Sequence, residues 1–172
     1  MSNNAKTDKL TQEQRSFNMS RIRGRDTGPE LTLRKALHAR GLRYRVHVRN
    51  LPGTPDIVFP TRRVVVFVNG CFWHGHDCPS GVMPKTNEVF WQDKIARTRA
   101  RDRLVEDALQ RDGWRTLNVW ECALRGRARL NLVDLVDKII EWLSVSEMKC
   151  DIAGAWTAQG TAAKMTSEPS RR

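Results

Sequence analysis

The sequence VVVFVNGCFWHGHDC occupies residues 64–78. Its first five residues are β-branched or aromatic, which is typical of a strand inside a sheet. The remainder is a short loop that contains Cys71, His76 and Cys78. Thiolate and imidazole are the ligands that zinc prefers, and a bound metal can hold a loop that is too short to fold alone. The stretch therefore predicts a buried strand that leads directly into a structural zinc site.

The fourth zinc ligand must come from another part of the chain, and Cys122 is the best candidate. A second strand is predicted at residues 114–120, with a helix between the two strands. Such a crossover places the strands parallel, so the residues that follow them emerge at the same edge of the sheet. Free cysteines are usually small buried hydrophobes, but that alternative gives the neighbouring histidines no role. Cys150 has no histidine neighbour and is expected to be a bystander thiol.

The remaining elements indicate an α/β fold with a mixed sheet flanked by helices. Capping patterns at Thr11 and Thr27, and the asparagines Asn87 and Asn131, mark four helix starts. The predicted helices cover residues 11–22, 27–41, 87–113 and 132–143, and the predicted strands cover residues 43–48, 56–59, 64–68 and 114–120.

Charge and composition restrict the partners and the compartment. The 172 residues fit one domain, and the formal net charge is +11. Residues 1–50 alone carry a net charge of +8, which favours a nucleic acid over the alternative of a merely solubilising surface. No apolar run could span a bilayer and the amino terminus lacks the apolar centre of a signal peptide, so a cytoplasmic protein is expected.

A candidate catalytic site surrounds Asp56. This carboxylate follows Pro55 at the mouth of a predicted strand, where it could bind a hard cation such as Mg²⁺. An aspartate after proline is more often a turn residue. The catalytic interpretation gains weight because Asn69 and His74 follow the neighbouring strand and Glu30 lies on the preceding helix, so that the four side chains could surround a phosphate.

Several short strings resemble the very-short-patch repair DNA mismatch endonucleases of bacteria. The resemblance runs from about Arg15 to Leu143. The strings are, in chain order, Arg15-Ser16 with Asn18-Met19, Arg25-Asp26-Thr27, Leu51-Pro52-Gly53 with Pro55-Asp56, Gly70-Cys71-Phe72-Trp73-His74 with His76 and Cys78, Phe90-Trp91, and Val119-Trp120-Glu121-Cys122-Ala123-Leu124-Arg125-Gly126.

The resemblance implies a restriction-endonuclease-like core and a Mg²⁺-dependent nick on the 5′ side of the thymine in a T·G mismatch left by deamination of 5-methylcytosine. Asp56 would bind Mg²⁺, His74 would be the general base or proton relay, and Glu30 would assist through metal-bound waters. Well-known members have a second active-site histidine at the position of Asn69, which can hydrogen-bond but cannot relay a proton near neutral pH. The implied structural zinc ligands are Cys71, His76, Cys78 and Cys122.

The resemblance also implies that aromatic side chains are inserted between base pairs. Such wedges unstack a base step, which costs least where pairing is already defective. The alternative for Phe72 and Trp73 is packing in the core. The residues expected to contact DNA are Phe72, Trp73, Trp91, Met19, Arg21, Arg23 and Lys94.

We expect residues 1–24 to form a basic DNA-contacting helix and arm, residues 25–143 to form the endonuclease domain, and residues 144–172 to be a disordered tail. The expected partner is double-stranded DNA, with mismatch-repair proteins as further candidates, and the chain is expected to be a monomer. Two other functions remain open. One is a restriction-type endonuclease that cuts both strands, and the other is a zinc-stabilised DNA-binding module without catalysis.

Overall fold

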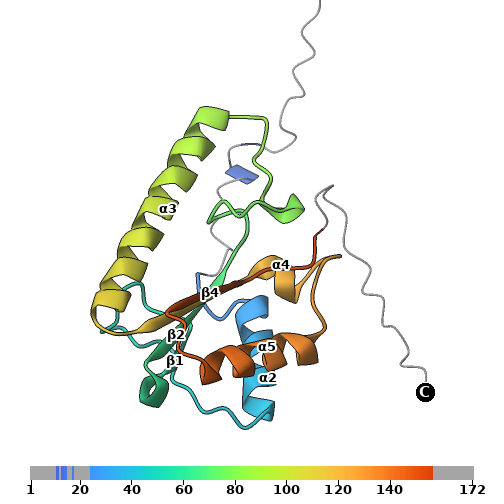
Figure 1. The fold of residues 1–172 in the computed structure, drawn as a ribbon. Helices are drawn as coiled ribbons and strands as arrows, with labels where there is room; N and C mark the ends of the chain where they lie inside the picture. Colours follow the sequence, from blue (N-terminus) through green and yellow to red (C-terminus); the bar gives the residue numbers. More distant parts are fainter. Residues whose placement is uncertain (1–10, 12, 15–16, 18–23, 157–172) are drawn as a thin grey trace, which may run out of the picture.

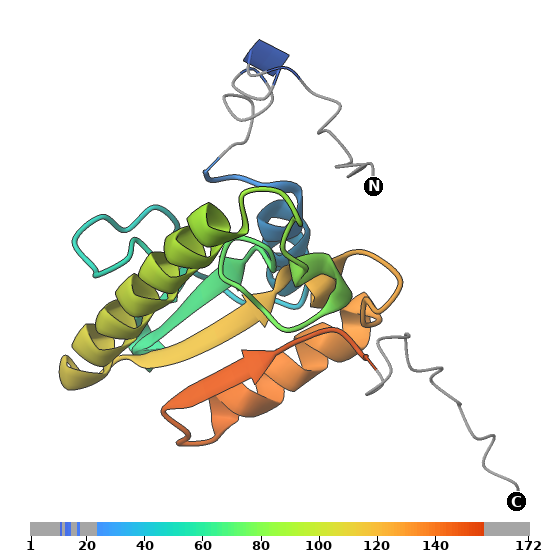
Figure 2. The same cartoon turned by 90° about the horizontal axis from the view of Figure 1, so that it is seen from above.

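The computed structural model describes residues 24–156 and, before them, residues 11, 13, 14 and 17. In this part of the chain a four-stranded sheet is covered by helices on both faces (Figures 1 and 2). The strand order is β1 (Ile57–Phe59), β2 (Val64–Asn69), β3 (Arg115–Trp120) and β4 (Lys149–Ile152). β1 is antiparallel to β2, while β3 and β4 continue the sheet in parallel, which confirms the predicted mixed sheet.

Alternating side chains of β2 supply two separate apolar layers. Val64 and Val66 belong to the larger cluster, which packs against helix α2 (Gly28–Ala39) and helix α5 (Leu132–Ser144). Val65 belongs to the smaller cluster, beneath the long helix α3 (Glu88–Arg111). A fully buried run of valines is what a sheet covered on both faces requires.

The short elements connect these layers. A 3-10 helix, η1 (Pro60–Arg62), turns β1 into β2, and a second, η2 (Pro79–Gly81), closes the cysteine–histidine loop. A single helical turn, α4 (Glu121–Leu124), follows β3 and carries Cys122. The predicted caps at Thr27 and Asn131 are confirmed, because their side chains accept hydrogen bonds from Glu30 N and Val133 N. Asn87 precedes α3 as predicted, but its side chain makes no capping hydrogen bond.

Two predictions about β structure are wrong. Residues 43–48 form no strand but only one bridge, between Arg45 and Val58, and His47 adopts a left-handed backbone that is incompatible with a continuing ladder. The tail expected to be disordered from Ser144 contains β4. Polar contacts explain β4: Lys149 and Asp151 are fixed by partners on α3 and β3, which hydrophobic patterning does not detect.

The amino-terminal helix predicted at residues 11–22 is described only in part. Its predicted capping box is present, because Thr11 and Gln14 exchange the two expected hydrogen bonds. Most of the helix predicted at residues 11–22 lies outside the described residues, as do Met19, Arg21 and Arg23, and residues 157–172 of the tail. In the described part of the chain, no helix combines the length and the apolar character that a membrane crossing requires.

Candidate active site and metal centre

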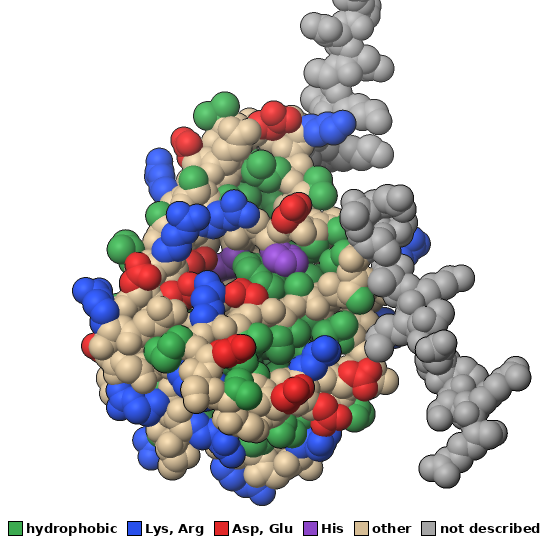
Figure 3. All heavy atoms as spheres, in the orientation of Figure 1, with side chains coloured by type: hydrophobic (Ala, Val, Ile, Leu, Met, Phe, Trp, Pro, Cys, Tyr) green, Lys and Arg blue, Asp and Glu red, His purple; other side chains and the backbone are tan. Residues whose placement is uncertain are grey.

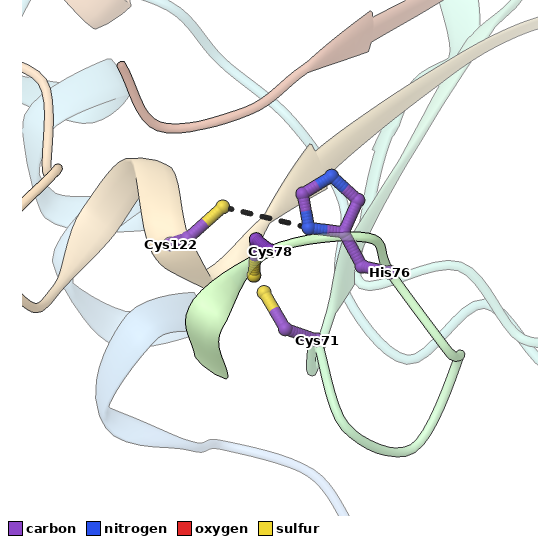
Figure 4. Close-up of side chains that lie close together, drawn as sticks. All are labelled: Cys71, His76, Cys78 and Cys122. Carbon is purple, nitrogen blue, oxygen red and sulfur yellow. Dashed lines mark hydrogen bonds between the residues drawn. The ribbon is translucent and has the colours of Figure 1, made fainter. Parts of the chain in front are cut away.

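Four predicted zinc ligands converge at the carboxyl edge of the parallel strands. The ligand atoms of Cys71, His76, Cys78 and Cys122 all lie within 4.8 Å of one another (Figure 4). Cys71 follows β2 and Cys122 follows β3, and the register pairs Asn69 with Trp120 just before them. Zinc bonds of about 2.0–2.3 Å put tetrahedral ligands roughly 3.3–3.8 Å apart, so ligand atoms within 4.8 Å of one another reach that geometry with small side-chain shifts. Three sulfurs and one nitrogen are the donor set of a closed structural zinc site.

The metal centre is buried and tightly enclosed. Cys71 is completely buried and Cys122 is 1% exposed. The ring of His76 directs Nδ1 toward Cys122 Sγ at 3.7 Å, and it stacks on Trp120 with ring centroids 4.2 Å apart. His76 would therefore bind the metal through Nδ1, with its ring held by the indole.

Residues 153–156, which follow β4, cover this centre. Gly154 N donates to Cys122 Sγ at 3.2 Å, and Ala153 and Trp156 pack against the cysteines. A Cβ at Gly154 would collide with the carbonyl oxygens of Cys122 and Ala128, so only glycine allows this close approach. The proximity of the two thiols has opposite effects on their pKa values: interaction with the Cys71 thiol lowers the pKa of Cys122 to about 5, and interaction with Cys122, together with burial, raises the pKa of Cys71. A thiolate is the form that binds zinc.

Asp56 lies where β1 begins and faces β2. Its Oδ2 accepts a hydrogen bond from Val68 N at 2.7 Å. Burial raises the pKa of Asp56 to about 6, and the nearby Glu30 carboxylate contributes to this rise. The Val68 hydrogen bond and the charges of Arg34 and His74 act in the opposite direction. A partly buried carboxylate with an elevated pKa and a like-charged neighbour is suited to receive a cation.

Glu30 is buried and is held by the start of α2. Its Oε1 accepts from the Thr27 hydroxyl at 2.8 Å, and its Oε2 accepts from Asp26 N at 2.9 Å and from Arg34 Nη2 at 3.1 Å. Arg34 also donates to the carbonyl oxygen of Asp56 at 3.0 Å. These hydrogen bonds hold the Glu30 side chain close to Asp56. A contact between Glu30 and metal-bound water stays a prediction. Arg34 was not predicted, although its i+4 spacing from Glu30 could have indicated the pair.

His74 is oriented by a carboxylate from α3. Its Nδ1 lies 2.6 Å from Asp102 Oδ2. A histidine whose Nδ1–H donates to a carboxylate presents Nε2 as the acceptor of a proton, which is the arrangement of a general base. His74 thus lies apart from the four candidate zinc ligands, while its role as a general base stays a prediction. Sequence analysis missed Asp102, because nothing in the spacing of two residues on different elements marks it.

Asn69 ends β2 on the face of the sheet covered by α3. Its Nδ2 donates to Asn118 Oδ1 on β3 at 3.3 Å. Asn118 in turn contacts Glu106 of α3 and Asp151 of β4. Sequence analysis predicted Asn69 as a site residue but missed Asn118, Glu106 and Asp151. Asn118 could have been noticed, because asparagine is uncommon in the middle of a strand such as β3.

The predicted DNA-contacting aromatic residues form one cluster. Phe72 lies 5.0 Å from both Trp73 and Trp91, measured between ring centroids, and Phe90 lies 5.2 Å from Trp91. Lys94 Nζ lies 5.4 Å from the ring centroid of Trp73 and 5.5 Å from that of Trp91. The rings of this aromatic cluster (Phe72, Trp73, Phe90 and Trp91) pack edge to face, and Phe90 is 57% exposed.

A cavity of about 680 Å³ lies between α3 and the sheet, and Asn69, His74 and Asp102 line it. Three arginines of α3 line the same cavity: Arg99, Arg101 and Arg103. Figure 3 shows histidine side chains in this hollow and Lys and Arg side chains beside it. Asp77, Asp102, Glu106 and Asp151 line the cavity together with the three arginines and Lys149, so its lining has no net formal charge. The arrangement combines a candidate base with guanidinium groups that can donate hydrogen bonds to a phosphate.

Comparisons with known proteins agree with these features. The model of the DNA mismatch endonuclease Vsr family matches residues 7–80. The DNA mismatch endonuclease Vsr of Escherichia coli K12 is 46% identical over 136 residues, which cover 79% of this chain and 85% of that protein. The type II nicking enzyme V.XorIIP of Xanthomonas oryzae pv. oryzae is 51% identical over 118 residues, 69% of this chain and 87% of the relative. The type II nicking enzyme V.NmeAIP of Neisseria meningitidis serogroup A is 43% identical over 122 residues, 71% of this chain and 87% of the relative.

This chain belongs to the Vsr DNA mismatch endonuclease family. The family assignment makes it a nuclease that acts on DNA, and the net charge of +11 agrees with a polyanionic partner. The matches to the three relatives cover most of each of them, so the assignment is not confined to the zinc loop.

In this Vsr-family chain the metal centre and the candidate catalytic residues are adjacent parts of one loop. His74 lies between the candidate metal ligands Cys71 and His76, and Phe72 and Trp73 lie in the same interval. A metal bound by these residues would fix both ends of this short segment, and with them the positions of the candidate base and of Phe72 and Trp73 relative to the sheet.

Proposed function

We propose that this Vsr-family protein nicks one strand of double-stranded DNA on the 5′ side of the thymine in a T·G mismatch, and so begins very-short-patch repair of deaminated 5-methylcytosine. The observation that carries the proposal is the His74–Asp102 pair, which lines a cavity together with three arginines of α3. Asp56 is close enough to His74 for their charges to interact, and Trp73 of the aromatic cluster precedes His74 in the sequence. A base, a carboxylate for a cation and a surface for opened base pairs are the parts that such a nick requires.

The proposed cofactors have different functions. Zn²⁺ at Cys71, His76, Cys78 and Cys122 would hold the loop, and the enclosed, soft donor set fits it. Asp56 is the candidate residue for Mg²⁺, since hard cations prefer oxygen ligands. Bound there, Mg²⁺ would supply positive charge to the phosphate in the transition state.

His74 is the proposed general base. The hydrogen bond to Asp102 occupies Nδ1 and stabilises the imidazolium that forms when Nε2 takes a proton from water. Arg99 donates to the carbonyl oxygens of His74 and Gly75, which ties this part of the loop to α3. The base is thus held from two directions before DNA binds.

The aromatic cluster is the proposed reader of the mismatch. Phe72, Trp73 and Trp91 form a compact apolar surface, and Lys94 at its rim could meet a phosphate. A wedge of this kind opens a weakened base step at less cost than a paired one. Met19, Arg21 and Arg23 are proposed as further DNA contacts, from the part of the chain that the structure does not describe.

The proposal includes a restriction-endonuclease-like core, which the mixed sheet with helices on both faces supports. The protein would act in the cytoplasm as a monomer on DNA, with mismatch-repair proteins as candidate partners. The division into a DNA-contacting arm at residues 1–24, a nuclease domain and a carboxyl-terminal tail remains part of the proposal, with β4 now assigned to the domain.

Duplexes labelled on either strand test the function. The zinc-loaded protein should nick only the thymine-containing strand of a T·G duplex, and only with Mg²⁺. Matched duplexes and duplexes with other mismatches serve as substrate controls, and Asp56→Asn should bind the T·G duplex without cutting it. Cleavage of both strands of a matched duplex would instead support a restriction-type enzyme. Binding without cleavage under every condition would support a non-catalytic module.

A further inference from the structure

A polar network on the face of the sheet that α3 covers determines how Asn118 is oriented. Asn118 is only 5% exposed, and its Nδ2 donates to Glu106 Oε1 at 2.7 Å and to Asp151 Oδ1 at 3.1 Å. A carboxylate can only accept, and Glu106 is also paired with Lys149 Nζ at 2.7 Å. Both amide hydrogens of Asn118 are therefore used, so its carbonyl oxygen must face away from the carboxylates.

The orientation of Asn118 fixes that of Asn69. The carbonyl oxygen of Asn118 accepts the hydrogen bond from Asn69 Nδ2 at 3.3 Å. An amide side chain has one donor nitrogen and one acceptor oxygen, so a nitrogen turned toward Asn118 leaves Oδ1 as the acceptor that Asn69 offers elsewhere. Asn69 and His74 line the same cavity. The carboxylates on α3 and β4 thus orient the amide of Asn69, so that its Oδ1 is an acceptor available to a ligand in that cavity beside the second hydrogen of Nδ2.

We propose that Asn69 Oδ1 accepts a hydrogen bond from the water that attacks the scissile phosphate, and that Asn118 is the positioning residue that keeps this oxygen available. The inference rests on the proposed function, because it needs a phosphodiester in the cavity. One hydrogen of the water is held by Asn69 and the other proton passes to His74 Nε2. This leaves a lone pair of the water oxygen directed at phosphorus.

The step balances without a redox partner. The water oxygen forms a bond to phosphorus while the bond from phosphorus to the 3′ oxygen of the preceding nucleotide breaks. His74 takes one proton, the departing 3′ oxygen takes a proton from solvent, and the second hydrogen of the water stays on the new 5′ phosphate until it ionises. Asn69 neither gains nor loses a proton, which is what an amide allows near neutral pH.

A double-mutant cycle measures the proposed role in the full, zinc-loaded chain. Single-turnover nicking of the T·G duplex is compared for Asn69→Leu, Asn118→Leu and the double variant. Loss of one positioned contact to the attacking water should slow Asn69→Leu by about tenfold to a hundredfold, with duplex affinity nearly unchanged. Asn118→Leu should also be slower, and the double variant no slower than Asn69→Leu alone, because both changes remove one contact.

A second, milder variant keeps the test valid if Asn118→Leu does not fold. Asp151→Ala removes one of the two acceptors that orient Asn118, and it should slow nicking in the wild-type background but not in the Asn69→Leu background. The matched control is Asp137→Ala, a similarly exposed carboxylate that pairs with Arg40 on the far side of the sheet. That control should leave the rate unchanged. Independent, multiplying effects of Asn69 and Asp151 would overturn the inference.

Nuclear magnetic resonance tests the orientation without any substrate. The side-chain amide signals of Asn69, identified by their absence in Asn69→Leu, should shift in Asp151→Ala and stay in place in Asp137→Ala. Unmoved signals would refute the network. An unchanged nicking rate in Asn69→Leu would refute only the role of Asn69, whereas a wild-type protein that cuts no duplex would refute the proposed function itself.

Discussion

Replacing Asp56 by asparagine should stabilise the Mg²⁺-free, zinc-loaded protein while it abolishes nicking. The folded state raises the pKa of this carboxyl from 3.8 to about 6, chiefly because it is buried and also because Glu30 is nearby. Ionised Asp56 is therefore unfavourable in the fold. Asparagine removes the charge, yet its carbonyl oxygen can still accept the hydrogen bond from Val68 N.

The size of the effect follows from the shift in pKa. A rise of about two pKa units corresponds to at most about 3 kcal/mol of unfolding free energy, since each unit is worth 1.36 kcal/mol. For a chain of this size that equals an increase of roughly 6–12 °C in Tm. Between pH of about 4 and about 6 the folded protein binds more protons than the unfolded chain, so the stability of the wild type falls as pH rises.

Denaturant unfolding of both proteins at several pH values tests this reasoning. The advantage of Asp56→Asn should be small near pH 4, grow through pH 6 and be constant above it. Mg²⁺ should then stabilise the wild type but not the variant, because binding to the native state alone adds stability. A variant that is no more stable than the wild type at pH 8 would show that Asp56 is not strained by burial, and the case for it as a cation ligand would lose its physical basis.

Three further predictions concern the metal, the base and the aromatic cluster. Cys122→Ser should lower the zinc content from one ion per chain and reduce Tm, whereas the control Cys150→Ser should change neither. Elemental analysis that finds one zinc ion per chain in both variants would contradict the predicted ligand set. Asp102→Asn should lower kcat about a hundredfold with KM nearly unchanged, because His74 loses the partner that stabilises its protonated form; steady-state kinetics that show only a change in KM would exclude that role. Trp73→Ala should bring the affinities for T·G and matched duplexes together without altering their salt dependence. Binding titrations at several salt concentrations measure both quantities. If the variant still prefers the T·G duplex, the Trp73 ring only packs against the loop.

The sequence was sufficient to place Cys122 beside the zinc loop. A right-handed crossover between two strands leaves few arrangements, and it brings the residues after β2 and β3 to one edge. The ligand types in the loop then supplied the chemistry. The caps at Thr27 and Asn131 were equally predictable, because a helix start needs an acceptor at a fixed offset in the sequence.

The network around Asn69 could not be predicted in the same way. Glu106 lies on a helix rich in both charges, and its partner Asn118 is one of three polar residues of β3. Their contact depends on the rotation of α3 over the sheet, which no spacing in the sequence encodes. The same holds for the pair formed by His74 and Asp102, which join a loop to that helix.

β4 was missed for a related reason. Residues 149–152 have an alternating burial pattern, but the surrounding composition is small and polar and is typical of a tail. Their stability comes from the ladder with β3 and from Lys149, whose Nζ bonds to Glu106 at 2.7 Å. A strand that depends on polar partners far away in the sequence has no local hydrophobic signature.

The late position of β4 in the sequence has a consequence for synthesis on the ribosome. Asp56, His74 and the four candidate zinc ligands all precede residue 123, whereas Asp151 and Gly154, which contact Asn118 and Cys122, follow it. The hydrogen bonds from Asn118 to Asp151 and from Gly154 N to Cys122 Sγ can therefore form only after residues 149–154 have been translated.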